Sequence, residues 1–412
     1  MKCFDICMDL PDNAELVERR STVGRHRSSW TVVALCAAAL LVIGQLYSVL
    51  PLLVILSTRW GVSPSAAAWL ATAFGFAYAA GMLISGPLSD RFGRRKLALV
   101  GVFTTAIITL SIAFSPNFPT ALILRIVQGL AAACFAPAVL AYIPEQIPPP
   151  LRSFALSALI GSFLAAAIVA PIASQELASA WVWNGWFLVT AALLVLNGIV
   201  LAFTLKKYRS FDGAPPGIGA AVAKLPAMVK NPTLRWLYLA TLTVMCGFVG
   251  VTTAMQLTGP AGLATDPNRL QLVRALTLPV CIAVPAASIA LRSFSTRSRV
   301  FVAIAVGAVA LAAMSLDFGV VWLCVCLALL TCSVAVAAPA LIEAIGAAGA
   351  HARGAATALY GFAMFTGASI GPLIATHLAP LGFVTVTRTL ALVMAVGTVC
   401  ATRGLTSNAD SK

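Results

Sequence analysis

The residues whose types and spacing could do chemistry concentrate in one short stretch of this sequence. From Asp90 to Leu97, five of eight positions are charged, in a chain of which only 10% is charged. Arg94, Arg95 and Lys96 suit a short positive loop that fixes the orientation of a membrane protein. Asp90 does not, because acidic residues contribute little to orientation. The acid therefore calls for a role beyond orientation.

A few ionisable residues lie inside long apolar runs instead of between them. Arg125 lies ~9 Å along the run 119–143, so it must face a cavity or a partner, or extend to the membrane interface. Gln128, one helical turn further on, favours a functional role for Arg125. Glu343, near one end of its run, could carry a proton or pair with a loop arginine. Three other residues lie nearer the outer ends of their runs and are expected to reach the interface: Arg274, His377 and Arg388.

The rest of the sequence offers no constellation for catalysis or metal binding. It contains no zinc-protease helix, no phosphate-binding loop and no His/Asp/Glu set within the apolar runs. The ten cysteines have neither metal nor disulfide spacing and are expected to pack as small apolar residues. We expect no metal and no cofactor. A membrane-embedded enzyme is disfavoured, as is a sensor, since the longest polar segments are only about 30 residues.

Composition explains where these residues must sit. The chain is 60% hydrophobic, with a mean hydropathy of +0.96. A soluble chain carries about 25% charged residues, so this one predicts an all-α polytopic membrane protein. Its net charge of +14 is spread between the apolar runs, whereas a nucleic-acid footprint would cluster on one patch. Nucleic acid is therefore excluded as a partner, and the lipid bilayer is expected.

Twelve membrane spans are predicted, in two groups of six. The first group covers 30–57, 66–88, 97–115, 119–143, 153–175 and 183–204, and the second 235–257, 270–291, 299–316, 319–345, 354–378 and 381–403. The predicted organisation is a tail at 1–29, a six-helix bundle at 30–205, a linker at 206–234, a second bundle at 235–403 and a tail at 404–412. With a cytoplasmic N-terminus, 22 of the 27 Lys and Arg residues lie in cytoplasmic segments. Both termini of this cell-membrane protein are therefore expected on the cytoplasmic side.

The two halves repeat each other. RSFALSALIGSFLAAAIVAP (152–171) and RGAATALYGFAMFTGASIGP (353–372) both run from an arginine to a proline 19 residues later, at an offset of 201. Ala-Pro-Ala at 136–138 answers Ala-Pro-Ala at 338–340, at an offset of 202. Two matches in the same order indicate a duplicated six-helix unit, an arrangement found in transporters whose substrate site lies between the halves.

The opening stretch, GPLSDRFGRRKL (86–97), resembles the loop between helices 2 and 3 of the major facilitator superfamily. Leu122-x-x-Arg125-x-x-Gln128-Gly129 looks like that family's helix 4 motif. Gly367-x-x-x-Gly371-Pro372 is similar to the antiporter motif G-x-x-x-G-P, and Ala166-x-x-x-Ala170-Pro171 is a weakened copy. The overall pattern looks most like the twelve-helix drug:proton antiporter branch.

The resemblance implies a conformational latch in this loop. In the family, the acid lies against the N-terminus of a helix in the other half, and the arginines pair with an acid at the end of helix 4. Asp90 matches the acid, and Glu145 is the candidate partner of Arg94. The glycines are expected to cap one helix and permit a tight turn before the next. The predicted latch residues are Gly86, Asp90, Arg91, Gly93, Arg94, Arg95 and Glu145, and the second half, at 291–300, lacks the acid and both glycines.

Other residues receive expected roles from the same resemblance. Helices 5 and 11 are expected to pack closely and kink at Ala170, Pro171, Gly367, Gly371 and Pro372. Spans 1, 4, 7 and 10 line the cavity in the family, and candidate lining residues here are Gln45, Tyr47, Gln256 and Tyr360. Each of these could equally be a packing or interfacial residue.

These features predict a secondary transporter that works as a monomer by alternating access. Export coupled to protons is favoured, and import of a small organic acid by proton symport is the alternative. The first six spans contain no acid, while Arg125 lies deep in the fourth. A cavity with this charge balance suits anionic, zwitterionic or neutral solutes more than cations.

Overall fold

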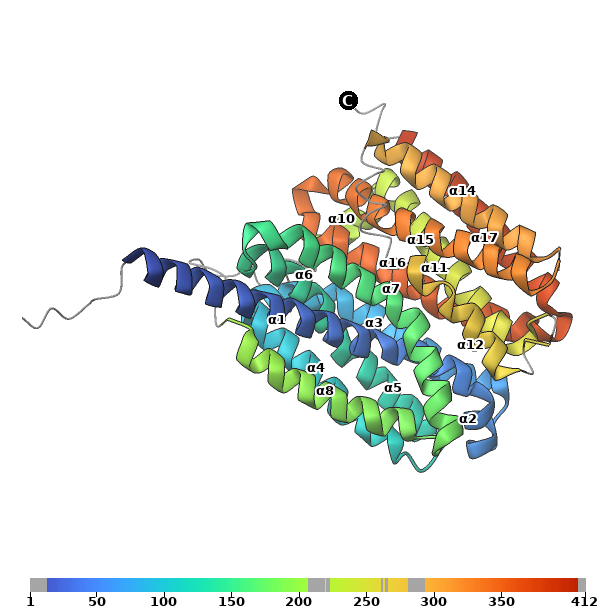
Figure 1. The fold of residues 1–412 in the computed structure, drawn as a ribbon. Helices are drawn as coiled ribbons and strands as arrows, with labels where there is room; N and C mark the ends of the chain where they lie inside the picture. The colour runs from blue at the N-terminus through green and yellow to red at the C-terminus, as the bar shows by residue number, and fades with distance from the viewer. Residues whose placement is uncertain are drawn as a thin grey trace, which may run out of the picture.

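The computed structural model describes residues 13–206, 219, 223–260, 262–263, 266–280, 293–316 and 318–406. Helices account for most of them, and none of the residues described is in a strand. Among the described residues, eleven helical segments are long and apolar enough to cross a membrane. The blue-to-green helices of the first half gather on one side, and most of the yellow-to-red helices of the second half on the other (Figure 1). The predicted all-α fold class is confirmed.

The first six spans match the predicted ones within a few residues at each end. The first consists of α1 (Asn13–Tyr47), η1 (Leu50–Leu52) and α2 (Leu53–Trp60), and the fourth of α5 (Phe118–Ala132) and α6 (Phe135–Gln146). The others are single helices: α3 (Pro64–Phe92), α4 (Arg94–Ala113), α7 (Pro149–Ala180) and α8 (Gly185–Thr204). Helix α1 begins well inside the segment that we predicted as a polar tail.

The second half follows the same order. After α10 (Leu225–Lys230), its helices are α11 (Pro232–Thr258), α12 (Pro267–Ala275), α14 (Thr296–Met314), α15 (Val320–Ala348), η3 (Ala350–Ala352), α16 (Arg353–Leu378), η4 (Ala379–Leu381) and α17 (Phe383–Thr406). The predicted eighth span, 270–291, coincides with α12 at its start, and its residues from 281 on lie outside the described residues. Most of the predicted linker and of the C-terminal tail lies outside them too.

Two spans are interrupted, and a proline lies close to each interruption. Pro51 lies in η1, and Pro137 is the third residue of α6. A proline lacks a backbone N–H, and its ring clashes with the carbonyl group four residues earlier, which here belongs to Tyr47 and Ala133. Helix α1 ends at Tyr47 and α5 ends at Ala132. Both breaks thus lie next to a proline, although α7 and α16 run unbroken through Pro171 and Pro372. Both breaks also come shortly after polar residues of the membrane interior.

The two halves meet along α3 and α16. Thr72 on α3 donates a hydrogen bond to the Ser369 carbonyl oxygen over 3.3 Å, and the Tyr78 ring lies 4.2 Å from that of Phe365, centroid to centroid. A Cβ on Gly75 would lie 1.9 Å from the Ser369 hydroxyl oxygen, so a larger residue there would force the Ser369 side chain to move. Helix α12 also contacts α7, and η1 contacts α11.

The small residues of the two GxxxGP-like motifs pack α7 and α16 within their own halves. A Cβ on Gly371 would lie 2.5 Å from the Cys246 carbonyl oxygen of α11, and one on Gly367 would lie 2.1 Å from the Leu242 carbonyl oxygen. In the first half, Ala170 is fully buried, and a Cβ on Gly44 would lie 3.0 Å from the Ala170 Cβ. Helix α1 thus packs closely on α7 in the first half, and α11 packs closely on α16 in the second. Helices α7 and α16 continue through Pro171 and Pro372 without a break.

We expect Gly367→Ala to destabilise the protein by about 1–3 kcal/mol, the usual range for overpacking a close contact. The added methyl group would meet backbone of α11, which cannot move aside as a flexible side chain can. Thermal unfolding in detergent, followed by tryptophan fluorescence, measures the effect. Gly354→Ala on the same helix is the matched control, since nothing lies within 4 Å of its Cβ. Equal midpoints for the two variants would contradict this packing role.

Candidate functional site

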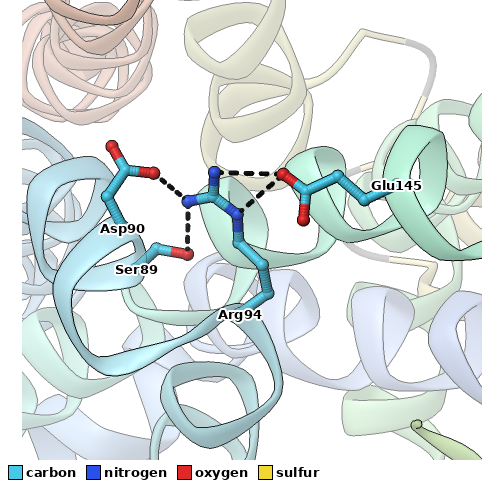
Figure 2. Close-up of polar contacts among 4 residues, drawn as sticks. All are labelled: Ser89, Asp90, Arg94 and Glu145. Atoms are coloured by element: carbon cyan, nitrogen blue, oxygen red, sulfur yellow. Dashed lines mark hydrogen bonds and ion pairs between the residues drawn. The ribbon is translucent and has the colours of Figure 1, made fainter. Parts of the chain in front are cut away.

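We call the end of the helix bundle that carries the loop 86–97 the basic end. Ion pairs lie at this end. Arg94, the first residue of α4, donates from Nε and Nη2 to one Glu145 carboxylate oxygen over 3.3 and 3.2 Å. Its Nη1 donates to Asp90 and, over 3.1 Å, to the Ser89 hydroxyl oxygen. Figure 2 shows the guanidinium group between the two carboxylates. We call Ser89, Asp90, Arg94 and Glu145 the basic-end cluster.

The cluster joins three helix ends of the first half. Ser89 and Asp90 lie in the last turn of α3, and Glu145 in the last turn of α6. Gly93 connects α3 to α4 with a φ of 91°, a conformation that favours glycine. Gly86 does not cap a helix as expected, because α3 continues through it to Phe92. The structure therefore brings Asp90, Arg94 and Glu145 together, with Gly93 making the turn.

The cluster is only partly shielded from solvent. The Arg94 side chain is 13% exposed, whereas those of Asp90 and Glu145 are about one third exposed (36% and 35%). Exposed ion pairs contribute little free energy, but a mostly buried arginine with four hydrogen bonds contributes more. The contacts of Asp90 that the structure describes stay within the first half, whereas the resemblance implied a contact with the other half.

The other two arginines of the loop do not belong to the cluster. Arg91 is exposed and lies over the ring of its neighbour Phe92. Arg95 donates to the carbonyl oxygens of Ala202 and Leu205, over 2.6 and 3.0 Å. These are terminal carbonyls of α8, which have no partner within the helix, and a cation there also favours the helix dipole. Arg95 thus caps α8, a role that the loop motif did not indicate.

The second half has a smaller ion pair at its corresponding helix ends. Arg299 on α14 donates to Glu343 on α15 over 2.8 Å, and the Thr296 hydroxyl donates to the other Glu343 oxygen over 2.7 Å. The Glu343 side chain is 55% exposed. Of the two alternatives for Glu343, this geometry favours pairing with a loop arginine. The second loop is therefore more than a set of orienting charges.

Arg125 lies in a fully hydrogen-bonded network in the interior of the first half. Its side chain is buried, and Nε and Nη2 each donate over 2.9 Å, to the carbonyl oxygens of Leu70 and Gln45. Its Nη1 donates to the Gln128 side chain over 2.6 Å, and the guanidinium carbon lies 4.4 Å from the Phe74 ring centroid. All three nitrogens of Arg125 therefore have partners, although none of these partners is an acid.

The same network extends to a third and a fourth helix. The Gln128 amide donates to the Thr109 hydroxyl over 2.6 Å and to the Gln45 side-chain oxygen over 3.3 Å. A Cβ on Gly129 would lie 2.3 Å from the Phe74 carbonyl oxygen, so glycine lets α5 approach α3 and Arg125 reach Leu70. We call Gln45, Thr109, Arg125 and Gln128 the buried arginine network.

Arg274 differs from the prediction. We expected its side chain to extend to the interface, but it is only 5% exposed and donates from Nη2 to the Gln256 side-chain oxygen over 3.0 Å. Its Nη1 has no hydrogen-bond partner in the described part of the chain. The expectation failed because distance from a helix end does not tell which way the helix faces. Arg388 and His377 are exposed, as expected of interfacial residues.

The four candidate cavity residues do not form one set. Gln45 belongs to the buried arginine network and Gln256 binds Arg274, while the Tyr360 hydroxyl donates to the Ala338 carbonyl oxygen over 3.1 Å. Tyr47 is buried in the hydrophobic core, which contains residues of both halves. The structure thus divides them among separate surroundings.

Comparison with known proteins agrees with the architecture. Residues 35–372 match the family model described as Major Facilitator Superfamily. The probable multidrug resistance protein EmrY of Escherichia coli is 27% identical over 45% of this chain and 38% of its own length. A D-xylose transporter of Levilactobacillus brevis is 34% identical over 32% of this chain and 30% of its own length. The chain thus spans less than half the length of these relatives.

The fold itself has a solved counterpart. The human organic anion transporter MFSD10 (TETRAN) superposes with a TM-score of 0.68 at 15% identity, covering 91% of this chain and 99% of the other. The family match covers most of the chain and includes the loop 86–97, the helix 4 motif and both GxxxGP-like motifs. The chain belongs to the major facilitator superfamily of membrane transporters.

Proposed function

We propose that this protein exports a small organic solute across the cell membrane by alternating access, in exchange for protons. Support comes from the family, from the likeness to EmrY, and from the two halves that meet along α3 and α16. The basic end then faces the cytoplasm, with both termini, and the protein works as a monomer. Proton-coupled import of a small organic acid is the alternative.

The charge of the membrane interior carries the proposal about the solute. Arg125 and Arg274 are buried, whereas Asp90, Glu145, Glu176 and Glu343 all lie within five residues of a helix end. Burying an unpaired charge is costly, so a cation would gain no compensating partner here. The solute is therefore anionic, zwitterionic or neutral.

Transport in everted membrane vesicles tests the proposal. With an imposed gradient, acidic inside, we expect the vesicles to accumulate salicylate and to lose that accumulation when an uncoupler collapses the gradient. Vesicles without the protein are the control. Accumulation that survives the uncoupler would contradict proton antiport, and accumulation in right-side-out vesicles only when the gradient is acidic outside would favour import by proton symport.

In the same vesicles, Glu343→Gln is expected to retain proton-dependent transport. Glu343 is more than half exposed and is paired with Arg299 and Thr296, so its loss removes a surface ion pair worth about 0–1 kcal/mol. Arg299→Ala should have an effect of similar size. If Glu343→Gln abolished the dependence on the pH gradient, Glu343 would carry the proton instead of only pairing with a loop arginine.

A further inference from the structure

We infer that Arg274, held by Gln256, binds the carboxylate group of the transported solute. The inference rests on the proposed function and narrows the transported solute to the anionic class. It assigns the anion site to the second half, near the seam with the first, and not to Arg125.

The first argument is that Arg274 is a buried cation with hydrogen-bonding capacity to spare. Its side chain is 95% buried, and its single described side-chain partner is the neutral Gln256. Buried polar groups are nearly always satisfied, and a buried charge is normally paired. The unpartnered Nη1 is therefore an exception that a negatively charged ligand would resolve.

The second argument is the contrast with Arg125. Each nitrogen of Arg125 already donates to an oxygen of the protein, and its guanidinium also lies over Phe74. A ligand carboxylate could bind there only by breaking these contacts. Of the two buried arginines, Arg274 alone has a nitrogen without a partner among the described residues.

The third argument is location. Arg274 lies on α12, which contacts α7 of the other half, and Figure 1 shows α12 beside the end of α7 that lies away from the basic end. Gln175, in this end of α7, also has a buried side-chain oxygen without a partner among the residues described. Two unsatisfied polar groups thus lie on the two helices that meet across the seam. A ligand bound at Arg274 would therefore lie beside a contact between the halves.

The chemistry suits a carboxylate. The two N–H bonds of Nη1 can donate to carboxylate oxygens in a charge-assisted geometry. The Gln256 side-chain oxygen accepts from Arg274, which orients the guanidinium group and leaves the Gln256 amide nitrogen as a further donor. A neutral amide of the same shape would leave the positive charge of Arg274 without a counter-ion.

Ligand-dependent thermal stability of the purified full-length protein tests the site. We use sodium salicylate as the probe and salicylamide as its uncharged counterpart. Salicylate should raise the unfolding midpoint of the wild type, and salicylamide should not. In Arg274→Gln, the apparent affinity for salicylate should fall by about tenfold to a hundredfold, the loss expected for a charge-assisted hydrogen bond. The matched control, Arg388→Gln, removes an exposed arginine and should bind like the wild type.

A second measurement needs no ligand. Because Arg274 is an uncompensated buried cation, Arg274→Gln should unfold without ligand at the same temperature as the wild type or higher. A markedly lower midpoint would overturn the inference by showing that Arg274 stabilises the fold. So would equal salicylate affinity in Arg274→Gln and wild type, or no response of the wild type to salicylate.

The transport assay separates this inference from the proposed function. If Arg274→Gln transports salicylate as well as the wild type, with the same uncoupler sensitivity, the exporter proposal stands and the site is wrong. If Arg274→Gln loses salicylate binding but wild-type transport ignores the gradient, the site stands and proton coupling is wrong.

Discussion

Replacement of Arg125 by methionine is expected to lower the free energy of unfolding by about 3 kcal/mol, near the upper end for a single substitution. Methionine fills much of the space but donates no hydrogen bond. The Leu70 and Gln45 carbonyl oxygens and the Gln128 side-chain oxygen would each lose the hydrogen bond from Arg125 inside the membrane. Each such loss costs about 1–3 kcal/mol, and the sum is reduced because the Leu70 carbonyl lies inside α3, where it can keep its helix bond, and the Gln45 carbonyl still accepts from the Ser48 hydroxyl.

The midpoint of thermal unfolding in detergent measures this effect. Arg125→Lys keeps the charge, but one ammonium group cannot reach three acceptors in different directions, so it should recover only part of the loss. Arg388→Met is the control, because Arg388 is exposed, and it should change the stability by less than about 0.5 kcal/mol. If Arg125→Met unfolded like Arg388→Met, the buried arginine network would not stabilise the fold.

The second large effect is expected at the basic-end cluster. Arg94→Ala removes hydrogen bonds to Ser89, Asp90 and Glu145 and leaves two carboxylates without their shared cation. We expect transport in everted vesicles to slow by about tenfold. This is equivalent to a change of about 1.4 kcal/mol in the free-energy difference between the two conformations that alternate during transport. This value is moderate because both carboxylates are about one third exposed, which weakens the pairs.

Arg91→Ala is the matched control for charge, since it removes an arginine of the same loop that lies outside the cluster. Its rate should stay within twofold of the wild type. A double-mutant cycle between Arg94→Ala and Glu145→Ala should give a coupling energy of about 1 kcal/mol. Equal slowing by Arg91→Ala and Arg94→Ala, or additive effects in the cycle, would show that only the net charge of the loop matters.

Much of this fold could be predicted because hydropathy reports span positions directly. Eleven of the twelve predicted spans agree with helices of the described residues within a few positions, and Glu145, the expected acid at the end of helix 4, lies beside Arg94. The spans depend only on position along the chain, whereas Glu145 was also indicated by the family resemblance. The interruptions near Pro51 and Pro137 were missed, although each proline removes a hydrogen bond four residues back.

What could not be predicted depends on the rotation of each helix about its axis. Arg274 and Arg388 look alike in sequence, each near one end of a span, yet the first is buried against Gln256 and the second is exposed. Arg95 caps α8, which lies more than 100 residues later in the chain. No spacing rule relates such residues, because packing between distant helices decides where their side chains point.

The way the first half ends has a practical consequence for engineering. Arg95 binds the last carbonyls of α8, and the Lys206 backbone N–H donates to the Tyr142 hydroxyl over 2.9 Å. These polar backbone groups at the end of the first half are therefore hydrogen-bonded by residues of that half. Helix α11 likewise begins with its own cap, the Asn231 side chain accepting from the Leu234 backbone N–H. The gene should therefore tolerate a break or an inserted reporter domain between these two points, with the halves assembling from separate polypeptides.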